Sequence, residues 1–196
     1  MFDINDLITA LSKLPGIGKK SASRLTFFLL KNKDISGNLL TILSDVIINI
    51  KQCELCGQYT IKNICDLCSN EKRNKNKLCI VEEQNDMNAI EETGSFDGIY
   101  HILMGAINPL SGFGPEKLKI NELKSRITKE SFSEILIATN PTIEGEATFL
   151  YLKNIINSLS PSIKISKLAT GIPMGGSLEY SDKLTLTKAI LTKQYL

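Results

Sequence analysis

The sequence predicts a mixed α/β protein in which helical segments precede a domain built on a mostly parallel β-sheet. Short apolar runs of strand length lie between residues 78 and 165, and the segments between them are long enough for crossover helices. Near the N-terminus, two helix-length segments are separated only by a turn rich in glycine and proline. The chain has 196 residues, 42% of them hydrophobic, which suffices for one such domain with a small appended module.

The N-terminal part is predicted to form two helices, at about residues 3–13 and 19–31, joined by a very short hairpin. Pro15, Gly16 and Gly18 lie in this turn. The two glycines let the backbone turn tightly and leave its amides uncovered, so a phosphate can approach them at the N-terminus of the second helix. A plainer alternative is a helical hairpin that only packs or contacts another subunit.

Basic residues surround this turn. The stretch from residue 13 to residue 33 has no acid and carries six cations: Lys13, Lys19, Lys20, Arg24, Lys31 and Lys33. Lys20 and Arg24 are four residues apart and therefore share one helical face. A P-loop is excluded, because that motif needs glycine where the chain has Lys13 and Ser or Thr where it has Lys20. The net charge of +2 is too small to indicate a partner by itself.

The turn and its cations resemble the helix-hairpin-helix of DNA-repair proteins, which grips the nucleic-acid backbone without reading its sequence. The resemblance implies an affinity that falls with salt, because phosphate contacts act through counterion release. The residues that it implies for DNA binding are Gly16, Gly18, Lys19, Lys20 and Arg24.

Four cysteines form two C-x-x-C pairs, Cys53 with Cys56 and Cys65 with Cys68, and eight residues separate the pairs. This spacing predicts one tetrahedral Zn²⁺ site per chain, because each pair can direct two thiolates at one metal. With no further ligand or histidine nearby, the zinc is expected to be structural. The alternatives are four unrelated cysteines or two disulfides. Cys79 stands apart in an apolar run and is expected to be a small buried hydrophobe.

Four apolar runs are predicted to be strands of the sheet, at residues 78–81, 100–104, 135–138 and 163–165. The basic, asparagine-rich stretch from Glu71 to Lys77 is expected to be a linker before the first of them. The clearest helix begins near Asn140 to Thr142, where a proline suits the first turn, and continues to about Leu159. The residues expected to mark one side of it are Ala147, Leu150, Tyr151, Asn154 and Ile155.

Polar residues follow the first and third of these strands, at the edge of a parallel sheet where ligands usually bind. They are Glu82, Glu83 and Asp86 after the first strand, and Asn140, Thr142, Glu144 and Glu146 after the third. A glutamate after one strand with paired acids after its neighbour would make a magnesium site for phosphoryl chemistry.

Residues 80–86 (IVEEQND) and 138–148 (ATNPTIEGEAT) are similar to the two signature segments of the Toprim domain. Further motifs occur in the same order along nearly the whole chain: the hairpin, the four cysteines, and residues 98–103, 108–110, 112–115 and 171–180. Together they resemble the RecR family of bacterial recombination mediators. The chain departs from the family pattern at Lys19, Ala106 and Ser177, which affects local loops and none of the cysteines.

The resemblance implies a helix-hairpin-helix region at residues 1–52, a C4-type zinc finger at 53–68, a Toprim domain at 77–172 and a helical C-terminal segment at 173–196. It also implies a ring-like tetramer that binds single- and double-stranded DNA. The implied partners are RecO and RecF, with which the protein would promote RecA loading on single-stranded gaps in RecBC-independent repair. No apolar stretch reaches the length of a bilayer span and an acid opens the chain, so a cytoplasmic, nucleoid-associated protein is expected.

Toprim enzymes such as topoisomerases and primases carry Asp-x-Asp after the third strand, whereas this chain has Asn140 and Thr142 there. Neutral oxygens are poor replacements for two carboxylates around a hard dication. We therefore expect no catalytic residues and no turnover. The signature residues expected to form a retained scaffold or a partner site are Glu82, Asp86, Asn140, Thr142 and Glu144. The alternatives are a Mg²⁺-dependent nuclease or topoisomerase-like enzyme and a zinc-dependent scaffold that binds only protein.

His101 is the only histidine, and on an apolar strand it is expected to be a hydrogen-bonded core or loop-facing residue rather than a catalytic one. The segments at residues 105–115 and 171–176 lack the Lys-Ser/Thr of a phosphate loop. They are expected to be surface loops near a partner site.

Overall fold

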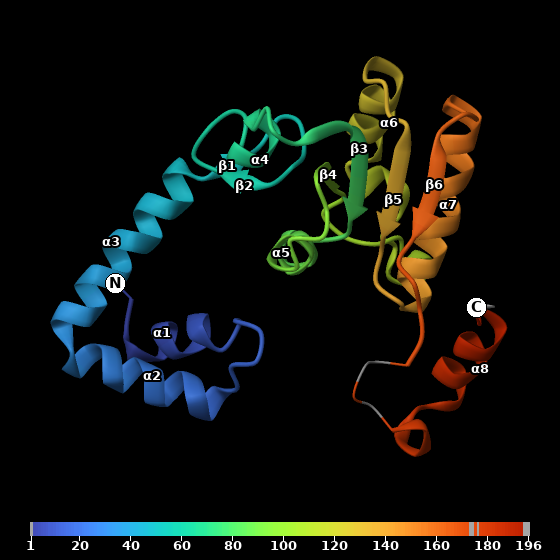
Figure 1. Ribbon diagram of the computed structural model, residues 1–196. Coiled ribbons are helices and arrows are strands. Elements are labelled where there is room, and N and C mark those ends of the chain that lie inside the picture. Colours follow the sequence, from blue (N-terminus) through green and yellow to red (C-terminus); the bar gives the residue numbers. More distant parts are fainter. Residues whose placement is uncertain (1, 173–174, 176, 194–196) are drawn as a thin grey trace. The chain divides into compact units, whose positions relative to one another are not determined.

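The structure, a computed structural model, describes residues 2–172, 175 and 177–193 and confirms the predicted mixed α/β fold (Figure 1). The chain divides into two compact units, Met1–Ile50 and Lys51–Leu196, so the four cysteines belong to the same unit as the sheet. Parts of the predicted C-terminal segment, namely residues 173–174, 176 and 194–196, lie outside the described residues.

The first unit consists of helices α1 (Ile4–Leu11), α2 (Lys19–Lys31) and α3 (Lys33–Asn49). Asp3 begins α1 with a capping box, in which its carboxylate accepts from the N–H of Asp6 and the Asp6 carboxylate accepts from the N–H of Asp3. α1 ends two residues earlier than predicted, and α2 has the predicted bounds. α3 buries none of its residues in the single chain.

The cysteine module contains a short antiparallel pair, β1 (Lys51–Gln52) and β2 (Tyr59–Thr60), followed by helix α4 (Asp66–Ser69). Gly57 lies in the turn between the strands with φ of +84°, a left-handed conformation that glycine adopts without steric cost. The strand pair and the turn bring the first cysteine pair back toward the second.

The second unit is built on a parallel four-stranded sheet in the order β4-β3-β5-β6. The strands are β3 (Asn74–Val81), β4 (Gly98–Ile102), β5 (Glu134–Ala138) and β6 (Lys164–Lys167). All four predicted strands are confirmed, but β3 begins four residues before Leu78. Residues 74–77 were expected to belong to a linker and instead begin β3, in which Asn74 pairs with Gly98 of β4 and Lys77 with Glu134 of β5, so that expectation was wrong.

Helices cover both faces of the sheet. Alternate residues of β3 enter two separate cores: Leu78 and Ile80 pack with α6 (Ile120–Lys129) and α7 (Ile143–Leu159), whereas Cys79 and Val81 pack with Met87 of α5 (Gln84–Glu92). Cys79 is fully buried, as predicted, and its burial raises the pKa of the thiol to about 12. The central strand is therefore apolar on both faces, as parallel strands usually are.

The packed side of α7 differs from the prediction. Its buried residues are Gly145, Thr148, Leu152 and Ile156. Of the residues expected to mark one side, Tyr151 and Ile155 lie at the margin of this core, and Leu150 is exposed. Two of these buried residues are a glycine and a threonine, so a prediction based on large apolar residues does not identify this side of the helix. Thr142 caps the helix through a hydrogen bond from the N–H of Gly145, so Pro141 precedes the helix rather than opening its first turn.

Two short 3₁₀ turns, η1 (Pro109–Ser111) and η2 (Pro115–Lys117), lie in the loop after β4, and a third, η3 (Leu178–Tyr180), lies after β6. The C-terminal helix α8 (Lys183–Leu191) begins at Asp182, whose carboxylate accepts from the N–H of Thr185. Across the part of the chain that is described, none of the helices has the length and apolar character needed to cross a bilayer.

Candidate functional site

The four predicted metal ligands converge in the cysteine module. One ligand atom from each of Cys53, Cys56, Cys65 and Cys68 lies within 4.8 Å of the others, and all four side chains are almost inaccessible to solvent. They are free thiols, not the two disulfides of the alternative. Within the described residues, no other set of three or more histidine, cysteine or acidic side chains gathers this closely.

Main-chain N–H groups are directed at the sulfurs. Gln58 donates to Sγ of Cys56 at 3.4 Å, and Cys65 donates to Sγ of Cys53 at 3.3 Å. Hydrogen bonds of this kind favour the thiolate, which is the form of cysteine that binds metal. The fold therefore prepares the sulfurs for a cation.

The cluster cannot carry four thiolates without a cation. The pKa of Cys65 is lowered, mainly by its hydrogen bonds with Cys56 and then with Cys68. The pKa of Cys68 is raised, mainly because its thiol bonds to Cys56 and Cys65, and burial adds to the effect. A dication would compensate the negative charge of four neighbouring thiolates and would replace the protons that the sulfurs share. A buried, closed set of four sulfurs fits the preferences of a structural metal site.

The hairpin between α1 and α2 has the predicted open backbone. Gly16 has φ of +77°, which explains a glycine there, whereas Gly18 has φ of −77° and needs no glycine for its conformation. A Cβ at either position would meet nothing within 4 Å, so both glycines leave the backbone accessible. Gly18 is the N-cap of α2 and provides no side-chain cap, so the first amides of the helix stay available to an anion.

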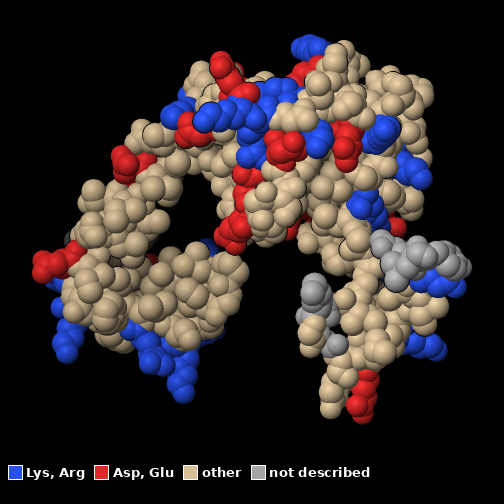
Figure 2. Space-filling view, viewed as in Figure 1, with Lys and Arg blue, Asp and Glu red and all other residues tan. Residues whose placement is uncertain are grey.

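The cations predicted to bind DNA are exposed beside this turn. Lys19, Lys20 and Arg24 all lie on α2 at the surface, and none forms an ion pair with any residue that the structure describes. Figure 2 shows Lys and Arg side chains projecting along α2 with no acid between them. Ala22 and Thr26 are the buried residues of the helix, and the helical period places Lys20 and Arg24 on the side away from them.

At the carboxyl edge of the sheet, Glu82 and Asn140 lie in direct contact. One carboxylate oxygen of Glu82 accepts from the main-chain N–H of Asn140 at 2.9 Å, and the other accepts from its side-chain amide at 2.8 Å. Glu82 is only 7% exposed. Its Oε1 also lies 2.8 Å from where a Cβ on Gly145 would be, so the carboxylate is packed against the start of α7. A helix N-terminus favours such a negative charge.

The other signature residues have separate partners. Asp86 accepts from the N–H of Glu83 at the start of α5. Glu144 accepts from the amide of Asn108 at 3.2 Å, and Thr142 caps α7. The sheet edge thus brings Glu82 and Asn140 together but gathers no three of its acids into a close group. These acids still influence one another electrostatically. The pKa of Glu83 is raised, first by burial and then by the negative charges of Asp86 and Glu82.

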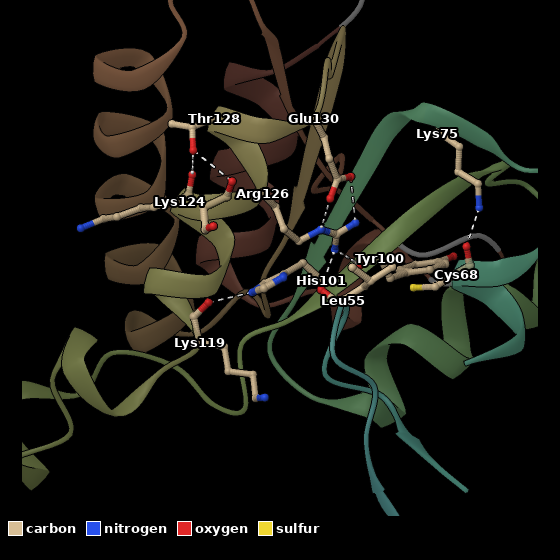
Figure 3. A network of polar contacts seen from close by, with 11 residues as sticks. Leu55, Cys68, Lys75, Tyr100, His101, Lys119, Lys124, Arg126, Thr128 and Glu130 are labelled. Carbon is tan, nitrogen blue, oxygen red and sulfur yellow. Dashed lines mark hydrogen bonds and ion pairs between the residues drawn. The ribbon is translucent and has the colours of Figure 1, made fainter. Parts of the chain in front are cut away.

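His101 is a buried core residue, as predicted, and its Nε2 lies 2.8 Å from the carbonyl oxygen of Lys119 (Figure 3). Burial lowers the pKa of this imidazole to about 4, with further lowering from the charges of Arg126 and Lys119. The ring is therefore neutral at physiological pH and almost fully enclosed by protein.

Sequence reasoning missed Arg126, which lies on α6 and is only 6% exposed. Its guanidinium donates to the carbonyl oxygens of Leu55 and Tyr100 and forms an ion pair with Glu130 (Figure 3). The one available sequence signal was Glu130 four residues later, which also fits an ordinary surface pair. A pocket of about 660 Å³ lies beside this network, away from the acidic sheet edge.

Comparison with protein families agrees with this architecture. Residues 4–45 match the model described as RecR, helix-hairpin-helix. Residues 76–169 match the Toprim domain, and residues 171–194 match the model described as RecR, C-terminal. The three matches follow one another along the chain in that order.

Curated relatives match over almost their full length. "Recombination protein RecR" of Desulfitobacterium hafniense (strain Y51) is 46% identical over 185 residues, which cover 94% of this chain and 91% of the relative. The protein of that name from Dehalococcoides mccartyi (strain 195) is 45% identical, and the match covers 97% of this chain and 93% of the relative. The protein of that name from Tropheryma whipplei (strain Twist) is 42% identical, and the match covers 98% of this chain and 97% of the relative. At this identity and coverage the chain belongs to the RecR family of recombination proteins.

Proposed function

We propose that this chain is a non-enzymatic mediator of DNA repair and recombination that binds DNA of either strandedness without sequence preference. In this role it acts in the cytoplasm, at the nucleoid, and works with RecO and RecF to help RecA load onto single-stranded gaps. The names of its relatives support the recombination role. The observation that carries the non-enzymatic part is the pair formed by Glu82 and Asn140.

In a magnesium site, a dication would neutralise the carboxylate at the position of Glu82. Here the two N–H groups of Asn140 supply that stabilisation instead, at 2.9 and 2.8 Å. Charge-assisted hydrogen bonds of this kind are among the stronger ones in proteins. The neutral amide also lacks the second negative charge that an aspartate would contribute to a metal site. The pair therefore supports a retained scaffold without phosphoryl chemistry.

DNA binding is assigned to the hairpin. Gly16 and Gly18 leave the backbone open, and Lys19, Lys20 and Arg24 supply exposed cations on the adjoining helix. Backbone contacts of this type give affinity that depends on salt and tolerates any sequence. Base-reading would require side chains arranged to enter a groove, and the turn instead offers main chain and flexible cations.

Assembly into a ring-like tetramer fits the surface of α3. This helix leaves a broad set of apolar side chains exposed in the single chain: Ile35, Leu39, Leu40, Ile42, Leu43, Val46, Ile47 and Ile48. Contiguous apolar surface of this extent usually marks an interface. A second copy of the chain is the occupant we propose. Repetition of a weakly basic hairpin around a ring would raise avidity without a large charge on each subunit.

We assign one structural Zn²⁺ to the four cysteines. The closed set of sulfurs and the N–H groups aimed at them support zinc, whose thiolate sites have this composition. The ion would hold the module folded, because a segment of this size has too little core of its own.

A reconstituted loading assay tests the function. RecA activity is measured on gapped DNA coated with single-stranded DNA-binding protein, in the presence of RecO and RecF. The chain should shorten the delay before RecA assembles, and the double variant Lys20→Ala/Arg24→Ala should not. No effect of the wild type on that delay would overturn the mediator role. Metal-dependent nicking by clean protein, lost in Glu82→Gln, would establish the enzyme alternative instead.

A further inference from the structure

The first cysteine pair closes one edge of the sheet. β4 is an edge strand, and its free side is the side that usually presents unpaired N–H groups to solvent. At the end of this strand, the N–H of Ile102 donates to the carbonyl oxygen of Cys56 at 2.8 Å. The turn that carries Cys53 and Cys56, called the knuckle from here on, thus supplies a hydrogen-bond acceptor at the edge where a further strand would otherwise pair. Close packing accompanies this bond, because a Cβ on Gly57 would lie 3.2 Å from the Ile102 carbonyl oxygen.

The guanidinium of Arg126 connects the same knuckle to strand β4 of the sheet. Its Nη1 donates to the carbonyl oxygen of Leu55 at 3.1 Å and to that of Tyr100 at 2.8 Å. Leu55 directly precedes a metal ligand, and Tyr100 lies in β4. Because the guanidinium is almost fully buried, each lost acceptor would leave part of a buried charge unsatisfied.

Two further hydrogen bonds join the cysteine module to the domain, one at the second cysteine pair and one at strand β2. Nζ of Lys75, in β3, donates to the carbonyl oxygen of Cys68 at 2.6 Å. The N–H of Tyr59 donates to the side chain of Gln84 at 2.7 Å, at the start of α5. The module is therefore bonded to the Toprim domain at Cys68, which is itself a predicted ligand, and at Tyr59 in the segment between the two cysteine pairs.

We propose that metal binding by the four cysteines and the order of the β4 edge are one coupled equilibrium, in which Arg126 is the positioning residue. The Leu55 and Cys56 carbonyls can meet their donors only while the knuckle holds its shape, and the metal is what holds it. Arg126 in turn holds the knuckle in the shape that binds metal. This inference rests on the metal site assigned above.

The coupling extends to the loop after β4. The carbonyl oxygen of Lys119 accepts from His101, and its N–H donates to the carbonyl oxygen of Leu103 at 3.0 Å. Lys119 is also the residue at which α6, the helix of Arg126, begins. Loss of the metal should therefore loosen residues 102–119 before it reaches the centre of the sheet.

The thermodynamic arm of the test compares metal affinity among variants. Zn²⁺ affinity is measured by competition with a chelator, and Co²⁺ absorption reports thiolate coordination. Arg126→Gln should weaken Zn²⁺ binding about tenfold, because binding must then also order the knuckle. Arg73→Gln is the matched control, since Arg73 donates to Gly98 at the start of β4, to Phe96 just before it and to Glu91, and no hydrogen bond of the described residues joins its side chain to a cysteine. Equal affinities in wild type and Arg126→Gln would overturn the proposal.

The second arm needs no variant. Amide exchange of the wild type is compared before and after removal of zinc with a chelator. The amides of Ile102, Leu103 and Lys119 should lose protection, while that of Leu152 in α7 should keep it. Unchanged exchange at Ile102, or an equal rise through α7, would contradict the localised coupling. A wild type that binds no Zn²⁺ at all would remove the metal site itself, an outcome distinct from a site that binds without coupling.

Discussion

The carboxylate of Glu82 accepts from both the main-chain N–H and the side-chain amide of Asn140, so the residue after β5 stabilises the acid after β3. This contact compensates the burial of the Glu82 carboxylate at the sheet edge. Burying a charge is costly unless hydrogen bonds compensate, and Asn140 supplies that compensation. The Toprim fold is thus kept while its acidic edge is stabilised by an amide.

Replacing Asn140 by aspartate should reverse this arrangement. The Asn140→Asp variant puts a second carboxylate against Glu82, so we expect a loss of about 2 kcal/mol in the free energy of unfolding at neutral pH. Mg²⁺ should recover part of the loss by bridging the carboxylates. Chemical denaturation with and without Mg²⁺ measures both effects. Asn88→Asp, at an exposed position of α5, is the control and should change stability by less than about 0.5 kcal/mol. A stable Asn140→Asp protein indifferent to Mg²⁺ would contradict the role of the amide.

Removing one cysteine ligand should disturb folding before it affects DNA. Zinc thiolate sites contribute on the order of 10 kcal/mol to the folding of small modules, so Cys65→Ser should lose zinc, melt at lower temperature and assemble poorly. Zinc content, thermal unfolding and size-exclusion chromatography check these outcomes. Cys79→Ser, which alters a buried cysteine outside the cluster, should keep its zinc. A Cys65→Ser protein that is soluble, zinc-free and normally oligomeric would show that the site is dispensable.

His101 should make stability depend on pH. Its pKa is lowered to about 4 in the folded state from an ordinary value of 6.5, so the unfolded chain binds more protons between these values. Stability therefore falls as the pH drops through 6.5 toward 4, by about 2 kcal/mol from about pH 7.5 to about pH 5. In His101→Gln this contribution should disappear, although the carboxylates still titrate. Denaturation of both proteins at the two pH values gives the difference, and parallel pH profiles would contradict the assignment.

The apolar runs were enough to predict all four strands, because parallel strands buried on both faces are apolar throughout, but the positions of α3, α5 and α6 were not predicted. β3 was predicted too short, since Asn74 to Lys77 are polar and pair only because neighbouring strands are present. The buried side of α7 was partly mispredicted because Gly145 and Thr148 form much of it. Tertiary contacts outweigh local composition in both cases.

The ligand set and the basic hairpin followed from residue spacing, which encodes chemistry directly. The orientation of Asn140 and the burial of Arg126 did not. An asparagine can donate or accept, and an arginine on a polar helix usually faces solvent, so neither role is visible before the neighbouring elements are in place.

DNA binding measured across a range of salt concentrations tests the central claim most directly. Lys20→Ala/Arg24→Ala should lower affinity for single- and double-stranded DNA by about tenfold or more and reduce the slope of log affinity against log salt by about 1.5 to 2. Lys31→Ala/Lys33→Ala removes the same charge away from the hairpin and should leave affinity and slope nearly unchanged. Equal losses in both variants, or wild-type binding that does not depend on salt, would contradict a hairpin that grips the phosphate backbone.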